Sequence, residues 1–421
     1  MKSALSRLLV SGLLTFGVAC DETEPGGPDD TDASIASPIR WVVRHADFSS
    51  ASISLLAADG SILADDYINS GSTKPGLTTT IGGDVDLPTV LEPGVLTIIS
   101  RYGTDVVTRI RLSDGAILGQ VRTQGATTSG FSSNPQDFLY IDSDTAWVSR
   151  YSHNTMASVP GNLRGSDLLA IDPSTMTLSG GRIDLSGFEV TFDAGGGEQV
   201  ARPRPKRIAR VGFFAAVGLD LVTQDFYYAA PGKLAIVDTR SGAFSSFELP
   251  AYTNCGNVAP VPQQPNLVAV MCQGYNYPNR EAESGVVIVS IDPVTGATTE
   301  VRHYATADHA AEDYVFDAYT MIDEDEFVGV HLGGYSETDP PDTLVHVNMT
   351  TGARATLFTS EHGSELFTQG GFDHETGLLL VPDTSAGLRR FQRQADGSFV
   401  ADGVIELVGH GVPVRGVSVA Y

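Results

Sequence analysis

The stretch VVIVSIDPVTG at residues 286–296 joins a run of apolar residues to a tight turn. The run is rich in β-branched residues, which is typical of a buried strand. In the turn, Asp292 can accept hydrogen bonds from nearby backbone amides and Pro293 presets φ, while Gly296 can take a left-handed conformation that a side chain disfavours. The stretch therefore predicts a β-strand that ends in a hairpin.

The same kind of turn occurs seven times between residues 39 and 421, and each copy follows an apolar strand. Successive turns end 45 to 66 residues apart, which is the spacing of a structural repeat. The seven turns are LAADG (56–60), LSDG (112–115), IDPSTM (171–176), VDTRSG (237–242), IDPVTG (291–296), VNMTTG (347–352) and QADG (394–397). Seven turns indicate seven repeats.

A second family of six turns alternates with the first. Its members are EPG (92–94), Asp142 to Asp144, Val211-Gly212, QQPN (263–266), Asp323 to Asp325, and DHETG (373–377). Because almost no segment of residues 39–421 shows helical periodicity, this domain is predicted to be all-β. We predict a seven-bladed β-propeller of four-stranded antiparallel blades, with strands A to D running outward from the axis. The first family forms the C-to-D hairpins and the second forms the A-to-B hairpins.

The missing seventh member of the second family predicts how the ring closes. The chain enters the first blade at IRWVVRH (39–45), which is interpreted as strand B, and the C-terminal VRGVSVAY (414–421) has no blade of its own. We expect the C-terminal segment to supply strand A of the first blade. This pairing removes a sheet edge that would otherwise promote aggregation.

The repeated V-x-x-[ID]-D-P-x-T-G hairpin, at blade spacing, resembles the YVTN-type and related seven-bladed propellers of bacterial envelopes. The resemblance covers essentially all of residues 39–421. The resemblance implies a fold and a location. Because its motif specifies only a turn, it identifies no catalytic residue in this chain.

Residues 1–19 are predicted to be a lipoprotein signal peptide. Lys2 and Arg7 precede or border an apolar stretch at residues 8–18 that is too short to span a bilayer. GVAC at 17–20 resembles the lipobox of bacterial lipoproteins, although Gly17 stands where that motif usually has Leu. The resemblance implies lipidation at Cys20, export, and membrane attachment through the acyl chains alone. Which membrane carries the anchor is left open.

Residues 20–38 are predicted to be a disordered acidic tether, because they carry too little apolar surface to fold. With Cys20 lipidated, Cys255 and Cys272 remain as an even pair in a compartment that permits disulfides. We expect them to be bridged, and two free buried thiols are the alternative. No Cys or His spacing suggests a zinc site.

Net charge limits the class of partner. The full chain has 26 Lys and Arg against 51 Asp and Glu. Loss of Lys2 and Arg7 with the signal peptide leaves a formal charge of about −27, which argues against a nucleic-acid partner. A monomer is expected.

The B-to-C and D-to-A connections lie on one face of a propeller, and several of them are longer than hairpins require: 150–167, 186–207, 220–232, 273–284 and 332–342. Binding surfaces favour the mixture of aromatic and polar residues that these loops contain. The candidate contacts are Tyr151, His153, Tyr227, Tyr228, Tyr275, Tyr277 and Tyr335. The alternative is that each tyrosine packs beneath its own loop.

The segment RPRPKRIAR at 202–210 concentrates five cations just before the expected inner strand of the fourth blade, near the mouth of the central channel. One interpretation is an anion or carboxylate site made by Arg202, Arg204, Lys206 and Arg207. The other is ion pairing with the acidic surface around it.

Contiguous catalytic motifs are absent: the chain has no GxSxG, HExxH, Walker, GxGxxG or CxxC pattern. No contiguous metal motif is present either, and no cofactor can be named. We therefore expect a non-enzymatic module that binds a protein or glycan partner in the envelope through its long-loop face. The alternatives are a metal- or cofactor-dependent hydrolase of the lactonase kind or an oxidoreductase, with its site at the axial channel, and a structural spacer.

Overall fold

The computed structural model describes residues 38–420 except 125–129, 157–159, 161–162, 195–196, 277–279, 281, 310–315, 332, 334–339 and 362–368. The side chains of residues 307, 309 and 316–319 also lie outside this description, as do the predicted signal peptide, Cys20 and nearly all of the tether. No helix in the described ranges is long and apolar enough to cross a membrane. The helices there are short 3-10 turns, η2 (Ser186–Phe188), η3 (Thr306–His309) and η4 (Gly409–Gly411).

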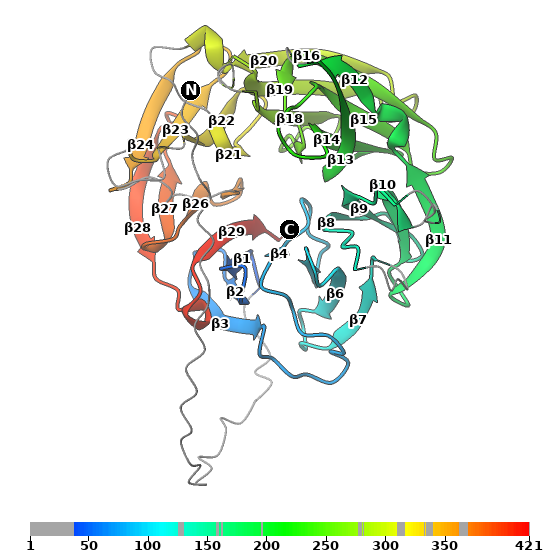
Figure 1. Cartoon of the computed structure of the whole chain (residues 1–421). Helices are drawn as coiled ribbons and strands as arrows, with labels where there is room; N and C mark the ends of the chain where they lie inside the picture. The colour runs from blue at the N-terminus through cyan, green and yellow to red at the C-terminus, as the bar shows by residue number, and fades with distance from the viewer. Residues whose placement is uncertain are drawn as a thin grey trace, which may run out of the picture. The chain divides into compact units, whose positions relative to one another are not determined.

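Seven antiparallel sheets form the blades of a propeller ring (Figure 1). Blade 1 contains β29 (Val414–Val419), β1 (Trp41–Ala46), β2 (Ala51–Leu56) and β3 (Ile62–Asn69). Blade 2 contains β4 (Val85–Asp86), β5 (Val95–Ser100), β6 (Val106–Arg111) and β7 (Ile117–Arg122). Blade 3 contains β8 (Pro135–Tyr140), β9 (Ala146–His153), β10 (Gly165–Asp172) and β11 (Thr177–Asp184). Blade 4 has five strands, β12 (Val190–Asp193), β13 (Glu198–Val211), β14 (Phe214–Thr223), β15 (Pro231–Asp238) and β16 (Phe244–Thr253).

The remaining three blades have four strands each within the described residues. Blade 5 contains β17 (Asn257–Pro260), β18 (Leu267–Gln273), β19 (Ser284–Ile291) and β20 (Thr298–Ala305). Blade 6 contains β21 (Phe316–Met321), β22 (Glu326–His331), β23 (Thr343–Asn348) and β24 (Arg354–Thr359). Blade 7 contains β25 (Gly371–Asp373), β26 (Leu378–Asp383), β27 (Gly387–Arg393) and β28 (Phe399–Ile405).

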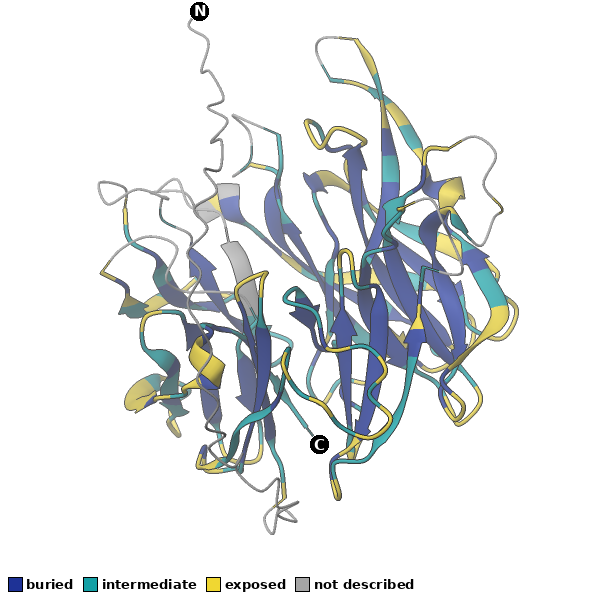
Figure 2. Cartoon of the chain, turned by 60° about the horizontal axis from the view of Figure 1, so that its bottom comes forward, coloured by how far each residue is buried: buried dark blue, intermediate teal, exposed yellow. Residues whose placement is uncertain are grey.

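The turn chemistry read from the sequence matches the hairpins of the structure. Every member of the first turn family joins strands C and D of a blade, and every member of the second joins strands A and B. In the turn that follows β19, Asp292 accepts hydrogen bonds from the amides of Val294 and Thr295, and Gly296 has φ of 72°. Figure 2 shows the consequence for burial, with buried strands joined by exposed turns.

Ring closure also follows the prediction. β29 pairs antiparallel with β1, with Trp41 opposite Val419 and Val43 opposite Val417. The C-terminal strand therefore completes the first blade. An ion pair between Arg40 and Asp373 joins blade 1 to blade 7.

Blade 4 departs from the prediction. RPRPKRIAR was expected to precede the inner strand, but it lies within β13, which is 14 residues long and forms a hairpin with β12. The β12 pairing ends at Ala201, so Pro203 and Pro205 occupy a part of β13 that has β14 on one side and no β12 partner on the other. An unpaired edge tolerates proline because no ladder hydrogen bond is lost there.

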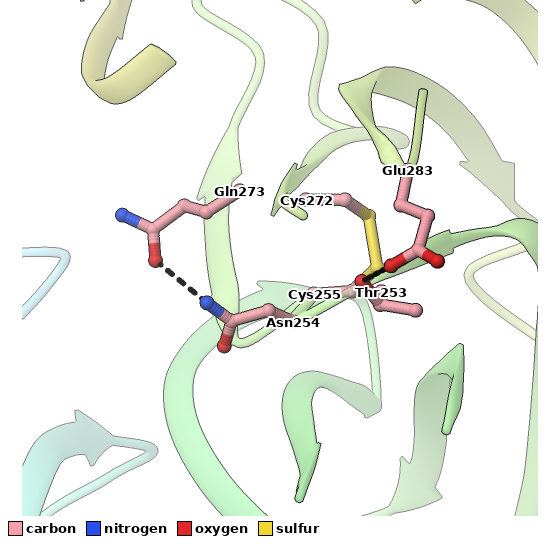
Figure 3. Close-up of a disulfide and its surroundings, with 6 residues drawn as sticks. All are labelled: Thr253, Asn254, Cys255, Cys272, Gln273 and Glu283. Atoms are coloured by element: carbon pink, nitrogen blue, oxygen red, sulfur yellow. Dashed lines mark hydrogen bonds between the residues drawn. A yellow bond between two sulfur atoms is a disulfide. The ribbon is translucent and has the colours of Figure 1, made fainter. Parts of the chain in front are cut away.

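The predicted disulfide is present between Cys255 and Cys272, whose Cα atoms are 4.0 Å apart (Figure 3). The two residues before Cys255 add side-chain hydrogen bonds to the end of β18 and to the residue before β19. Thr253 Oγ1 donates to Glu283 Oε2 at 2.8 Å, and Asn254 Nδ2 donates to Gln273 Oε1 at 3.2 Å. The bridge therefore connects the start of blade 5 to the end of β18, beside blade 4.

Candidate functional site

Strand β13 positions two of the predicted cations at the junction of blades 3 and 4. Arg202 and Arg204 are two residues apart on a strand, so their side chains project from the same face. Ser149 Oγ on β9 of blade 3 donates to the Lys206 carbonyl at 2.8 Å, which fixes β13 against β9. Figure 1 shows β13 on the side of blade 4 that faces β9.

Arg204 is a buried cation whose guanidinium forms no hydrogen bond with the described residues. It is 2% exposed, and its Nε and Nη2 atoms have no partner among the described residues. Its guanidinium carbon lies 4.1 Å from the Phe226 ring centroid and 5.4 Å from that of Tyr151. The rings stabilise the charge but satisfy none of the N–H donors. Burial lowers the pKa of Arg204, yet an arginine stays protonated at neutral pH.

Asp220 lies next to Arg204, because the two residues are register partners on β13 and β14. It is 3% exposed, and its Oδ1 atom has no hydrogen-bond partner among the described residues, while Oδ2 lies 3.9 Å from Lys206 Nζ. Gly256 lines the carboxylate closely: a Cβ there would lie 2.2 Å from Oδ1. A buried carboxylate oxygen that receives no hydrogen bond costs free energy of folding. A ligand group that donates a hydrogen bond to Oδ1 would recover that free energy.

Tyr151 on β9 contributes a hydroxyl near the same carboxylate. Burial and the charge of Asp220 raise its pKa well above the usual tyrosine value, so the hydroxyl keeps its proton and donates it to the Asp220 carboxylate. Arg204, Asp220, Tyr151 and Phe226 are called the Arg204 cluster below.

His153 and Arg202 form the outer edge of this cluster. Arg202 Nη1 lies 2.9 Å from His153 Nε2, and because a guanidinium can only donate, Nε2 is the acceptor. The imidazole proton is therefore on Nδ1, which faces Ser166 Oγ at 3.2 Å. Burial and Arg202 lower the pKa of His153 to about 4, so the ring is neutral at pH 7. Arg202 also pairs with Glu189 Oε2 at 2.9 Å.

The loop after β14 covers Arg204. Phe226 is 48% exposed and has φ of 60°, and the Tyr275 hydroxyl donates to its carbonyl oxygen at 2.6 Å. Tyr227 points into solvent, 74% exposed, and its ring centroid lies 6.4 Å from that of Tyr228. Tyr275 thus supports the residue that shields Arg204, while the Tyr227 ring lies at the surface.

Arg207 belongs to a different structure at the centre of the ring. Its Nη2 atom donates to Asp86 Oδ2 at 2.8 Å and to Gln369 Oε1 at 2.9 Å. Arg44 and Arg101 lie 3.6 and 3.5 Å from the same Asp86 carboxylate. These contacts connect blades 1, 2 and 4 with the segment that precedes β25. The charge of Arg207 is therefore compensated by Asp86, and Arg207 is not free to bind an anionic ligand.

The structure therefore divides the four-cation site proposed from the sequence. Arg202 and Arg204 come together with Tyr151, His153 and Tyr275, whereas Lys206 faces Asp220 and Arg207 is part of the axial network. Tyr277 and Tyr335 lie outside the described residues. A register shift between Pro205 and Ile208 explains the division, because a bulge redirects the side chains that follow it.

Sequence reasoning missed Asp220, Phe226 and Glu189. A signal for Asp220 was available: β14 reads FAAVGLDLVT, every residue of it is buried, and Asp220 is its one ionisable residue. Phe226 and Glu189 carry no such signal, because their contacts with the cations come from loop packing.

Metal binding finds no support in the described residues, in which no group of three or more His, Cys, Asp or Glu side chains could hold an ion. The axial position suggested for a metal or cofactor contains the network of Arg207 and Asp86.

The fold and this arrangement define a seven-bladed β-propeller with a buried cationic cluster at a junction between blades.

No protein-family model matches the chain, and no curated protein matches its sequence. Similar solved structures include a putative 6-phosphogluconolactonase from Bacteroides fragilis, with 10% identity and a TM-score of 0.53 over 92% of this chain and 99% of that one. The putative 6-phosphogluconolactonase from Bacteroides uniformis has 12% identity and a TM-score of 0.53 over 90% of this chain and 99% of that one. The periplasmic gluconolactonase PpgL of Pseudomonas aeruginosa has 12% identity and a TM-score of 0.55 over 91% and 99%. At these identities the similarity shows the fold.

Proposed function

We propose that the protein binds a small hydroxylated carboxylate, such as a sugar acid, at the Arg204 cluster. One observation carries the proposal: Arg204 and Asp220 are adjacent, buried and oppositely charged, and each has polar atoms with no partner among the described residues. A ligand that supplies both a carboxylate and a hydroxyl group would satisfy both side chains.

Each part of such a ligand has a matching group. The planar guanidinium of Arg204 suits a carboxylate, with which it can form two parallel hydrogen bonds. Asp220 Oδ1 can accept a hydrogen bond from a ligand hydroxyl, and the Tyr151 oxygen can accept another. The rings of Tyr151 and Phe226 offer apolar surface for the carbon skeleton.

The similar solved structures support this choice of chemistry. Three of them are described as gluconolactonases or putative 6-phosphogluconolactonases. Opening a sugar lactone with water gives a hydroxylated carboxylate, which is the class of ligand that the cluster suits.

Calorimetric titration with D-gluconate, D-glucose and D-glucosamine tests the proposal. Gluconate is expected to bind, and the neutral and cationic sugars are not. Replacing Arg204 by Met should weaken gluconate binding by about 2 kcal/mol, or roughly 30-fold, because charge-assisted hydrogen bonds are lost. Arg210→Met is the matched control, since Arg210 lies on the same strand but bonds to the Gly212 and Ile141 carbonyls. Equal binding of all three sugars, or unchanged affinity in the Arg204 variant, would show that the cluster is not the site.

Hydrolysis of a sugar lactone is the second candidate function, favoured by the unpaired Asp220 oxygen beside a buried guanidinium. Asp220 would take a proton from water as the water oxygen bonds to the lactone carbonyl carbon, and Arg204 would stabilise the oxyanion. The ring C–O bond then breaks, and the proton passes from Asp220 to the departing alkoxide oxygen.

Lactone hydrolysis can be separated from binding by following acid release from glucono-1,5-lactone in a pH-stat. Asp220→Asn should lower the catalysed rate at least ~100-fold, the size expected for loss of a general base. If the unaltered protein gives only the spontaneous rate while it still binds gluconate, the protein is a binding module and the hydrolase proposal is wrong.

We also propose that the protein is exported and lipid-anchored at Cys20, as the N-terminal sequence predicts. In that setting the long-loop face would meet solutes of the envelope, and a protein or glycan partner remains a further proposal for the same face.

A further inference from the structure

We infer that the Arg204 cluster selects a singly charged acid and discriminates against its phosphorylated counterpart. The inference rests on the proposed function, and it names the charge of the ligand. It follows from how the cations around the cluster are already paired.

Six side chains near the cluster can carry positive charge. Arg280 donates to the Gln273 carbonyl, and Arg164 is an exposed residue whose charge acts on His153. Of the other four, three are accounted for. Arg202 pairs with Glu189 at 2.9 Å, and Lys206 Nζ lies 3.9 Å from Asp220 Oδ2. His153 accepts a hydrogen bond from Arg202 through Nε2, which requires that nitrogen to be unprotonated. Arg204 alone among these four has no anionic partner within ion-pair distance in the described residues.

Arg202 is balanced by Glu189 and Lys206 by Asp220, so Arg204 is the one buried cation among these four left to balance. A carboxylate at Arg204 would bring this set of charged groups to neutrality. A phosphate on the same ligand would add about two more negative charges. Nearby Arg202 could receive it only by releasing Glu189, whose carboxylate would then repel it.

Glu189 is thus the residue that sets the charge selectivity. Its ion pair with Arg202 is partly exposed, with side-chain exposures of 40% and 29%, and such pairs contribute little to stability. Replacing Glu189 should therefore leave the fold intact while it frees Arg202 for a phosphate.

The test compares D-gluconate and 6-phospho-D-gluconate by calorimetric titration of the unaltered protein, Glu189→Gln and Glu248→Gln. The unaltered protein should bind gluconate at least ~10-fold more tightly, because Arg202, which would receive the phosphate, is paired with Glu189. Glu189→Gln should bind the phosphorylated acid about 10-fold more tightly than the unaltered protein, with little change for gluconate. Glu248→Gln is the matched control, because it breaks another partly exposed ion pair of blade 4, with Lys233, on the outer strands.

The outcomes separate the two proposals. If the unaltered protein binds the phosphorylated acid as tightly as gluconate, or if Glu189→Gln changes neither affinity, charge selectivity is overturned while the binding site stands. If neither acid binds any of the three proteins, the proposed function fails and this inference fails with it.

Discussion

Arg204 on β13 and Asp220 on β14 are register partners, yet their charged groups do not form an ion pair in the described structure. Each side chain turns toward other neighbours. Arg204 lies against two aromatic rings, and Asp220 lies against Gly256 and Lys206. Two adjacent buried charges that do not neutralise each other cost stability, which is a common property of sites shaped by binding.

Stability measurements should distinguish Arg204 from Arg207. Arg207→Met leaves Asp86 buried without its closest cation and should lower the free energy of unfolding by about 3–5 kcal/mol. Arg204→Met removes a guanidinium that forms no hydrogen bond to any residue the structure describes, and it should cost under about 1 kcal/mol or stabilise the protein. Urea unfolding followed by fluorescence measures both. Equal losses in the two variants would mean that Arg204 is structural.

Phe226 should matter for affinity although it is half exposed. Phe226→Ala removes the closer of the two rings over Arg204 and lets water reach the guanidinium. Gluconate binding should weaken by about 1 kcal/mol, the range of a cation–π contact. The neighbouring Tyr227→Ala is the control, since Tyr227 is more exposed than Phe226. Titration of both variants gives the comparison, and similar losses would argue against a specific role for Phe226.

His153 should make the fold less stable in acid. Its pKa is lowered from 6.5 to about 4 by burial and Arg202, so the folded chain binds fewer protons than the unfolded chain between these values. The stability that comes from this difference is present above pH 6.5 and is lost as the pH falls toward 4. The difference in unfolding free energy between the unaltered protein and His153→Gln should therefore shrink from pH 7 to pH 4. His303→Gln, which changes an exposed histidine on β20, is the control, and a constant difference for His153→Gln would contradict the prediction.

The disulfide should support both stability and the site. Cys255 and Cys272 are 17 residues apart, so replacing both by Ser should lower the free energy of unfolding by about 3 kcal/mol. Gly256, which follows Cys255, packs on the Asp220 carboxylate, so gluconate affinity should fall as well. Chemical unfolding and titration measure the two effects. Loss of stability with unchanged affinity would show that the bridge does not position Asp220.

Lipidation at Cys20 can be tested in a bacterial host. The unaltered chain should fractionate with membranes and incorporate a labelled fatty acid, and Cys20→Ser should do neither. Mass spectrometry of the N-terminal peptide identifies the modified residue. Membrane association that persists in Cys20→Ser would point to another attachment.

The fold was predictable because its signals are local. Asp292, Pro293 and Gly296 specify a turn from their own conformational preferences, and repetition of that turn gives the blade count. The Cys255–Cys272 pairing followed from setting Cys20 aside as the expected lipid site, which leaves an even pair of cysteines. These features do not depend on which distant residues come together.

The site was predictable only in part. Arg202, Arg204, Tyr151 and His153 were all named as candidates, but as members of separate groups. Whether these residues lie close together depends on how β9 packs against β13, about 50 residues later in the chain. The bulge after Pro205, which separates Arg207 from Arg204, comes from the pairing with β14. Packing between blades and strand register are tertiary properties, and the local pattern does not encode them.

The pairing of β29 with β1 also determines when blade 1 can be completed during synthesis. Of the strands that the structure describes, β1 is synthesised first and β29, which completes its sheet, is synthesised last. Until then the first blade keeps an open edge while the other six can already form from contiguous segments. A stalled or C-terminally clipped chain is thus left with an unpaired strand, which favours aggregation and recognition by chaperones or proteases.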